Sequence, residues 1–126
     1  MRSGELLGLQ WPNVDLSAGV AVLHDTKNGT SRDVALFSRS RAVLSLMRQD
    51  TGPVFTISGA LRDVRFRAAR DSIGLKGTFH DLRHTAATRL AKVLSVMELC
   101  RQFGWSDPRM AMVYFNKSAS DIARLA

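Results

Sequence analysis

The stretch FHDLRHTAATRL, residues 79–90, gathers two histidines and an arginine in the first turns of a predicted helix. Thr78 at its N-cap and Asp81 three residues later resemble a capping box. His80 and Arg83 then lie one turn apart, where the free amides and the positive dipole end of a helix attract anions. A guanidinium can hold two phosphate oxygens in one plane. The pattern indicates an anion site, and the alternative is a capped surface helix with its polar residues toward water.

The two histidines of this segment are expected to differ in role. The helix dipole and the nearby arginine disfavour a protonated imidazole, so we expect His80 to stay neutral and able to accept a proton. We expect His84 to turn toward the packed side of the helix and to hydrogen-bond the backbone. His80 is therefore the better candidate for proton transfer.

The composition favours a small globular protein with an anionic partner. The chain has 126 residues, 45% of them hydrophobic and 23% charged, which is enough for one compact domain with a core. The net charge of +7 favours nucleic acid as a partner, because each neutralised phosphate releases condensed counterions. No stretch is long and apolar enough to span a bilayer, and the first residues lack a signal-peptide core. A cytoplasmic protein without membrane contact is expected.

The single cysteine, Cys100, excludes an intramolecular disulfide and a cysteine metal cluster. It lies in SVMELCRQF, where Val96, Leu99, Cys100 and Phe103 recur at helical spacing, so a buried reduced thiol is expected. The sequence offers no cluster of acidic ligands and no phosphate-binding glycine loop. We therefore expect no metal and no nucleotide cofactor.

The elements that must position these residues form an α+β pattern dominated by helices. A short helical pattern occupies GELLGLQW, residues 4–11. The β-branched runs GVAVLHD (19–25) and SRDVALF (31–37) flank an Asn-Gly pair at 28–29, which is a strong hairpin-turn signal. PVFTI (53–57) is a third candidate strand. Several helices packed with a small three-stranded antiparallel sheet are therefore expected.

Two predicted helices carry apolar stripes. In residues 38–49 the stripe consists of Ala42, Val43, Leu46 and Met47. In residues 58–74 one side is formed by Leu61, Val64 and Ala68. The second helix also carries four arginines within nine positions, Arg62, Arg65, Arg67 and Arg70.

Local start signals predict the remaining helices. One begins at Thr78. Ser95 and Glu98 repeat the capping-box pattern at the start of another. Pro108, directly after Asp107, is predicted at the first helical position of a third.

HDLRHTAAT resembles the signature of the tyrosine recombinase (phage integrase) family of DNA-breaking and rejoining enzymes. The other family motifs follow in their expected order. MRSGELLGLQW resembles the opening arginine box, with Arg2 as its arginine and Glu5 as the supporting acid. TKNGTSRDVAL resembles the hairpin that presents the catalytic lysine, here Lys27. FGWSDPRMAMVYF resembles the closing segment, in which Trp105 precedes the only tyrosine, Tyr114, by nine positions.

The resemblance implies a set of catalytic residues, namely Arg2, Lys27, His80, Arg83, Trp105 and Tyr114. The arginines would hold the non-bridging oxygens of one phosphate while Tyr114 attacks phosphorus and forms a 3′-phosphotyrosyl bond. His80 would accept the phenolic proton, and Lys27 would protonate the leaving 5′-oxygen. Trp105 would donate its indole N–H to a phosphate oxygen, or serve packing alone.

The resemblance also implies the organisation and the activity. Residues 1–126 are expected to be part of a catalytic domain, truncated at its N-terminus, with the upstream catalytic-domain helices and the N-terminal DNA-clamping domain of relatives absent. The implied function is a site-specific DNA recombinase or integrase. One alternative is a type IB topoisomerase-like enzyme, which the short interval from Arg83 to Tyr114 disfavours. Another is a basic DNA-binding module that is inactive on its own.

The implied partner is double-stranded DNA containing a recombination site, bound by a homotetramer. The arginines expected to contact its phosphates are Arg62, Arg65, Arg67 and Arg70. Such contacts position a duplex without specifying its sequence. The tail FNKSASDIARLA resembles the segment that docks on a neighbouring protomer in relatives, with Ile122 and Leu125 as apolar anchors. The alternative is a tail that folds back on its own domain.

Overall fold

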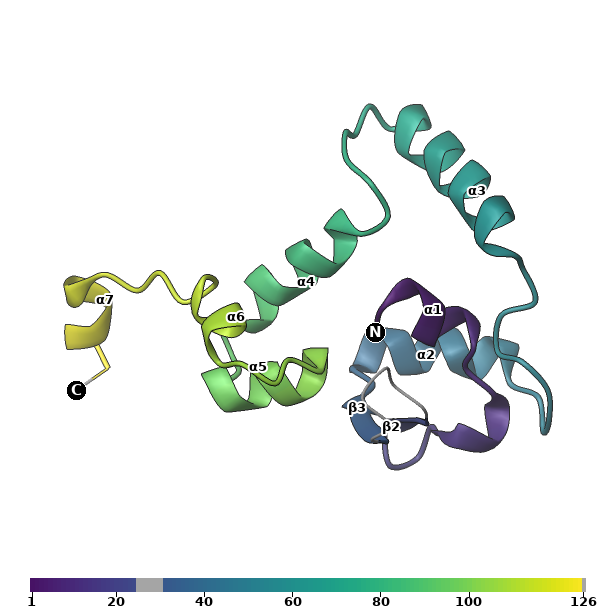
Figure 1. The fold of residues 1–126 in the computed structure, drawn as a ribbon, viewed down its shortest axis with the longest axis horizontal. Coiled ribbons are helices and arrows are strands. Elements are labelled where there is room, and N and C mark those ends of the chain that lie inside the picture. Colours follow the sequence, from purple (N-terminus) through teal and green to yellow (C-terminus); the bar gives the residue numbers. More distant parts are fainter. Residues whose placement is uncertain (25–30, 126) are drawn as a thin grey trace.

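The computed structural model describes residues 1–24 and 31–125, and they form two packed bodies (Figure 1). The first body contains α1 (Ser3–Leu7), a 3₁₀ turn (Trp11–Asn13), β1 (Val14–Asp15), β2 (Val20–Leu23), β3 (Arg32–Ala35) and α2 (Ser38–Met47). The second contains α4 (Asp81–Leu90), α5 (Val96–Phe103) and α6 (Arg109–Met112). α3 (Gly59–Ser72) lies between them along the chain, and α7 (Ala119–Ala123) extends beyond the second body. Within the described ranges, no helix is long and apolar enough to cross a membrane.

The sheet of the first body is antiparallel, in the order β1-β2-β3. Ala21 pairs with Val34, and both are buried, because alternate side chains of a strand face the same side. The first core consists of Leu9, Trp11, Val14, Ala21, Leu23, Val34, Leu44 and Val54. The two predicted strands within 19–25 and 31–37 are confirmed, whereas the Asn-Gly pair at 28–29 lies outside the described residues.

The predicted strand at 53–57 is wrong, and the third strand of the sheet is the two-residue β1. Pro53 has no N–H for a ladder, and a single bridge joins it to Gln10. Val54 is buried and donates its N–H to the Leu9 carbonyl at 2.9 Å. The apolar run therefore fills the core as an irregular segment.

The second body is built around α5. Leu99, Cys100 and Phe103 are buried on one side of it, so the predicted burial of the Cys100 thiol is confirmed. The other members of this core are Ala87, Ala91 and Ala111. The Ser95 N–H donates to the Glu98 carboxylate at 2.7 Å, which confirms the predicted capping box. α6 begins at Arg109, one residue later than predicted.

The apolar stripes predicted for α2 and α3 do not lie in a core. α2 buries Leu44 instead, while Val43 is exposed and Leu46 is 90% exposed. α3 buries no residue, and its Leu61 and Val64 are exposed. Both helices therefore present apolar side chains on their surfaces.

The two bodies meet where α5 ends against β3. β3 is an edge strand, and the Gln102 side chain pairs the free backbone groups of its last residue, Ala35. The Ala35 N–H donates to Gln102 Oε1 at 2.9 Å, and Gln102 Nε2 donates to the Ala35 carbonyl at 2.9 Å. Arg32 Nη1 donates to the Gln102 carbonyl at 2.9 Å. One amide side chain thus continues the sheet ladder across the joint.

We expect Gln102→Ala to lower the free energy of unfolding by about 1 kcal/mol, because both backbone groups of Ala35 lose their partner at a site that water reaches. Urea unfolding measures the change. Gln49→Ala, at an exposed glutamine after α2, is the matched control and is expected to stay within about 0.5 kcal/mol of the wild type. Equal stability of the two variants would contradict the role given to Gln102.

Candidate active site

The segment before α4 begins with the predicted capping box. The Thr78 N–H donates to the Asp81 carboxylate at 2.6 Å, and the Asp81 N–H donates to Thr78 Oγ1 at 3.3 Å. These hydrogen bonds from Thr78 hold the pKa of the Asp81 carboxyl below its ordinary value. The α-helix itself begins at Asp81, so His80 lies directly before it rather than at its second position. His80 is exposed there, one turn from Arg83, as the spacing predicts.

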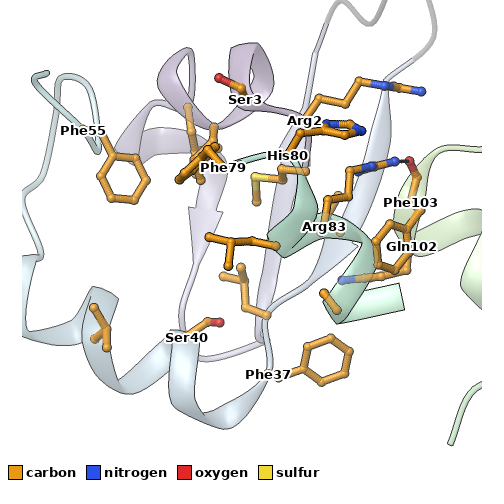
Figure 2. Close-up of a pocket in the computed structure, with 18 of the residues that line it drawn as sticks. Arg2, Ser3, Phe37, Ser40, Phe55, Phe79, His80, Arg83, Gln102 and Phe103 are labelled. Carbon is orange, nitrogen blue, oxygen red and sulfur yellow. Dashed lines mark hydrogen bonds between the residues drawn. The ribbon is translucent and has the colours of Figure 1, made fainter. Parts of the chain in front are cut away.

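Arg83 is held against the end of α5. Its Nη2 donates to the Phe103 carbonyl, and its guanidinium carbon lies 4.8 Å from the centre of the Phe103 ring (Figure 2). Burial lowers the pKa of Arg83, and the positive charge of Arg2 lowers it further, but the group stays protonated because the ordinary pKa of an arginine lies far above neutral pH. Arg83 Nη1 is buried and has no hydrogen-bond partner among the described residues. It therefore lacks the hydrogen bond that a buried polar group normally makes.

Glu5 is the carboxylate around which the arginines of the first body gather. Arg32 Nη2 donates to it at 2.9 Å, and Arg2 Nη1 lies 3.4 Å away. The Glu5 and Arg32 side chains are each only 14% exposed, whereas the Arg2 side chain is 51% exposed. The acid therefore holds one buried guanidinium firmly and leaves much of Arg2 accessible.

Glu5 stays ionised despite its burial. Burial raises the pKa of its carboxyl, but hydrogen bonds from the Arg2 backbone N–H and the Arg32 guanidinium outweigh burial and leave the pKa below its ordinary value. The Arg2 N–H donates to Glu5 at 2.6 Å. Glu5, which the sequence predicts to support Arg2, thus also pairs with a second arginine, Arg32.

Arg32 is a site residue that sequence reasoning missed. A usable signal exists, because Arg32 lies two residues before the buried Val34 and therefore on the inner face of β3. It reaches across the joint to the α5 end, where Gly104 closes the helix in a left-handed conformation with φ of 70°. A Cβ at Gly104 would lie 2.6 Å from Arg32 Nε. Glycine is thus needed there both for the helix end and for the passage of the arginine.

An aromatic stack leads from Arg83 to Tyr114. Phe103 and Trp105 are stacked with ring centres 4.8 Å apart, and Trp105 and Tyr114 are stacked at 5.6 Å and nearly parallel. The Arg83 guanidinium also lies 5.6 Å from the Trp105 ring centre. Trp105 therefore contacts both Arg83 and Tyr114. The nine-residue interval from Trp105 to Tyr114 contains α6, which brings the two rings together.

The expectation for His84 is wrong. It is exposed, and its Nδ1 lies 2.6 Å from the Tyr114 hydroxyl instead of contacting the backbone. Its ring also meets the His80 ring edge-on, with centres 5.1 Å apart. Consecutive residues of a helix point about 100° apart, so the partly buried Arg83 and the outward His84 serve different neighbours.

A cavity of about 810 Å³ runs beside these groups, and Figure 2 shows Arg2, His80 and Arg83 close together along it. Its other walls are largely apolar and include Phe37 and Phe55. Of the predicted site residues, Arg2, His80 and Arg83 line the cavity. Glu5, Trp105 and Tyr114 do not line it, and they join the group through the contacts of Glu5 with Arg2, of Trp105 with Arg83 and of Tyr114 with Trp105. Lys27 lies outside the described residues. The described residues contain no group of three side chains that could hold a metal ion.

The four arginines of α3 divide into two pairs. Arg62 lies over the Phe79 ring at 4.7 Å, and Arg70 donates to the Gly77 carbonyl at 2.9 Å, so both fasten α3 to the segment before α4. Arg65 and Arg67 are exposed.

The fold and the site define a basic, mostly helical domain in which arginines and a tyrosine converge. Residues 1–121 match the model of the Phage integrase family. The match covers almost the whole chain, so the protein belongs to the phage integrase, or tyrosine recombinase, family. The resemblance seen in HDLRHTAAT and its companion motifs is thereby confirmed.

Curated relatives are similar over most of this chain. A shufflon-specific DNA recombinase of Escherichia coli is 39% identical over 118 residues, which cover 90% of this chain and 31% of that protein. A Haemophilus influenzae protein described as an integrase/recombinase is 35% identical over 134 residues, covering 99% and 43%. The chain thus spans less than half the length of these relatives.

Two solved structures share the fold. The XerA recombinase superimposes with a TM-score of 0.75 at 20% identity, over 98% of this chain and 50% of that one. The Tn1549 transposon integrase, solved in complex with circular intermediate DNA, gives 0.72 at 18% identity, over 100% and 56%. The predicted class, a mostly helical α+β domain with a three-stranded antiparallel sheet, is confirmed.

We expect Glu5→Gln to lower the free energy of unfolding by about 2 kcal/mol at pH 7, because Arg32 loses its buried charged partner. A carboxylate whose pKa is depressed on folding stabilises the fold above its unfolded pKa, about 4.3, and this contribution is lost as the pH falls through the folded pKa. The deficit of Glu5→Gln is therefore expected to be full at neutral pH and to vanish in acid.

Urea unfolding of both proteins from pH 7 down to acid measures this deficit. Asp50→Asn removes an exposed carboxylate and serves as the control, with little change in stability at any pH. A Glu5→Gln deficit that is the same at every pH would contradict the assigned charge state.

Proposed function

We propose that this chain is part of the catalytic domain of a site-specific DNA recombinase or integrase, which cleaves and rejoins strands through a 3′-phosphotyrosyl intermediate. The observation that carries the proposal is the contact of Trp105 with two predicted catalytic residues. The Trp105 ring is stacked on the only tyrosine, Tyr114, and the Arg83 guanidinium lies 5.6 Å from the centre of the same ring. Family membership supports it, and so does the E. coli relative named as a DNA recombinase.

Arg2 and Arg83 are proposed to hold the non-bridging oxygens of the scissile phosphate. A phosphodiester resists attack because its charge repels nucleophiles, and the transition state concentrates more charge on its oxygens. Fixed guanidiniums stabilise that charge without rearranging. The accessible part of Arg2 and the cavity that Arg2 and Arg83 both line support this assignment.

Tyr114 is proposed to attack phosphorus, which splits a difficult substitution into two steps and keeps the phosphoryl bond energy for rejoining. The sequence assigns the phenolic proton to His80, which faces the same cavity as Arg2 and Arg83. Lys27 would protonate the leaving 5′-oxygen. Trp105 would fix the tyrosine ring by stacking and offer its N–H to a phosphate oxygen.

Double-stranded DNA is the proposed partner. The net charge of +7 supports it, as does the fold shared with an integrase solved in complex with DNA. Of the four α3 arginines, the exposed Arg65 and Arg67 are proposed to contact phosphates directly. Arg62 and Arg70 would act mainly by holding α3 in place.

The proposed assembly on DNA is a homotetramer that exchanges C-terminal tails. Ile122 is 57% exposed and Leu125 is 72% exposed, and α7 extends away from the second body (Figure 1). An apolar pair in this position supports docking on a neighbouring protomer over folding back on its own domain.

Two other functions remain distinct from this proposal. A type IB topoisomerase-like enzyme would relax supercoils without exchanging strands between two sites. A DNA-binding fragment would bind duplexes but form no covalent adduct. Strand exchange between two sites distinguishes the recombinase from the topoisomerase-like enzyme. Formation of a covalent adduct distinguishes it from the DNA-binding fragment.

Tyr114→Phe is expected to abolish a covalent protein–DNA adduct, because it removes the single phenolic nucleophile. The assay uses a nicked suicide duplex carrying the recombination site and a denaturing gel. Wild-type protein is expected to form the adduct, first as the 126-residue chain and, if that is silent, in its full open reading frame. An adduct that persists in Tyr114→Phe would remove the tyrosine from its role.

The double variant Arg65→Ala/Arg67→Ala is expected to bind duplex DNA more weakly. Because two phosphate contacts are lost, the slope of the logarithm of the binding constant against the logarithm of the salt concentration is expected to become shallower by about 2. Fluorescence anisotropy across a salt series measures both. Arg101→Ala, at an exposed arginine of α5, controls for loss of positive charge alone and is expected to leave the slope nearly unchanged. An unchanged slope in the double variant would contradict the assignment to α3.

A further inference from the structure

The contact between His84 and Tyr114 is not explained by the catalytic set that the sequence predicts. His84 Nδ1 lies 2.6 Å from the phenolic oxygen, and the two rings are tilted by 31° with centres 6.4 Å apart. His80, the predicted proton acceptor, makes no hydrogen bond to this hydroxyl within the described residues. The phenol is thus held on one side by the Trp105 ring and at its hydroxyl by His84.

We infer that His84, rather than His80, accepts the proton of Tyr114 when the phenol attacks phosphorus. The inference rests on the proposed function of the chain. The Tyr114 Oη–H bond breaks and its proton passes to Nδ1 of His84 as the Oη–P bond forms. The P–O5′ bond then breaks, and its electron pair leaves on the 5′-oxygen, which takes a separate proton. In rejoining, the steps reverse, and Nδ1 returns its proton to the departing phenolate.

The placement of the two histidines supports this division. His80 lines the cavity together with Arg2 and Arg83, so it faces the proposed phosphate position. His84 does not line that cavity and is directed to the tyrosine. Arg83 and His84 are neighbours on the rigid α4, so one helix fixes the phosphate clamp and the proton acceptor relative to each other.

Three titratable or charged groups face the His84–Tyr114 pair. The His80 ring meets His84 edge-on, the Asp81 carboxylate lies close enough to feel the charge of His84, and Arg83 lies close enough to Tyr114 to interact with it electrostatically. In this arrangement Asp81 favours a cation on His84 after proton transfer, while Arg83 favours an anionic phenolate. Both influences assist movement of the proton from Tyr114 to His84.

The single tyrosine makes the test selective, because fluorotyrosine supplied to growing cells enters this chain only at position 114. We expect His84→Ala to slow adduct formation at least tenfold at pH 7. Replacing Tyr114 by the more acidic 3,5-difluorotyrosine, or raising the pH, is expected to restore much of the rate, because the phenol then ionises without a base. His80→Ala is the matched control and is expected to lose activity without this rescue.

His84→Asn separates proton transfer from positioning, because its amide can hydrogen-bond the phenol but cannot take its proton. We expect His84→Asn to be as slow as His84→Ala. Full activity of His84→Asn, an unchanged rate in His84→Ala, or a slow His84→Ala that difluorotyrosine does not rescue would each overturn the inference. In all three cases the proposed function survives if the wild type forms an adduct and Tyr114→Phe does not.

A second measurement needs no activity. The ¹⁹F resonance of 3-fluorotyrosine at position 114 is expected to shift over the pH range in which an imidazole changes charge. This pH-dependent change of the ¹⁹F shift is expected to vanish in His84→Asn and to persist in His80→Asn. A pH-dependent ¹⁹F change that persists without His84 would overturn the inference even in a chain that cleaves no DNA.

Discussion

The carbonyl end of α5 is the constraint on which the rest of the site depends. The last carbonyls of a helix lack intrahelical partners and attract cations. Here the Gln102 carbonyl receives Arg32 and the Phe103 carbonyl receives Arg83, one from each body. The left-handed Gly104 leaves room for Arg32 to pass. A single helix end thus brings a guanidinium of the sheet body beside a guanidinium of the helical body.

The electrostatic balance of the site follows from this arrangement. Three arginines, Arg2, Arg32 and Arg83, share the one carboxylate of Glu5, and the described part of the chain adds no second acid to the cluster. The charge of Glu5 is neutralised mainly by Arg32, because both side chains are buried and their charged atoms lie 2.9 Å apart. The positive charge left over is that of Arg2 and Arg83. An anion such as a backbone phosphate would balance this charge.

Local signals in the sequence predicted the parts of the site that neighbouring residues determine. The capping boxes at Thr78 and Ser95 depend on hydrogen bonds across three residues, and both are present. The strand at 53–57 did not form because Pro53 has no N–H for a ladder and only a single bridge pairs the segment. The apolar stripe of α2 is largely exposed because burial depends on which distant elements cover a segment. Arg32 and the His84–Tyr114 contact were missed for the same reason, since each joins residues 27 or 30 positions apart.

The two hydrophobic cores are separate, and polar contacts at one joint hold the bodies together. Arg2 belongs to one body and Arg83 to the other, so the proposed phosphate clamp would exist only while the joint is closed. Local folding of either half, however complete, does not create it. On the proposed function, catalysis would therefore depend on the docking of the two halves, as it does between subunits of an oligomer. Separating the halves would abolish it even with every helix and strand intact.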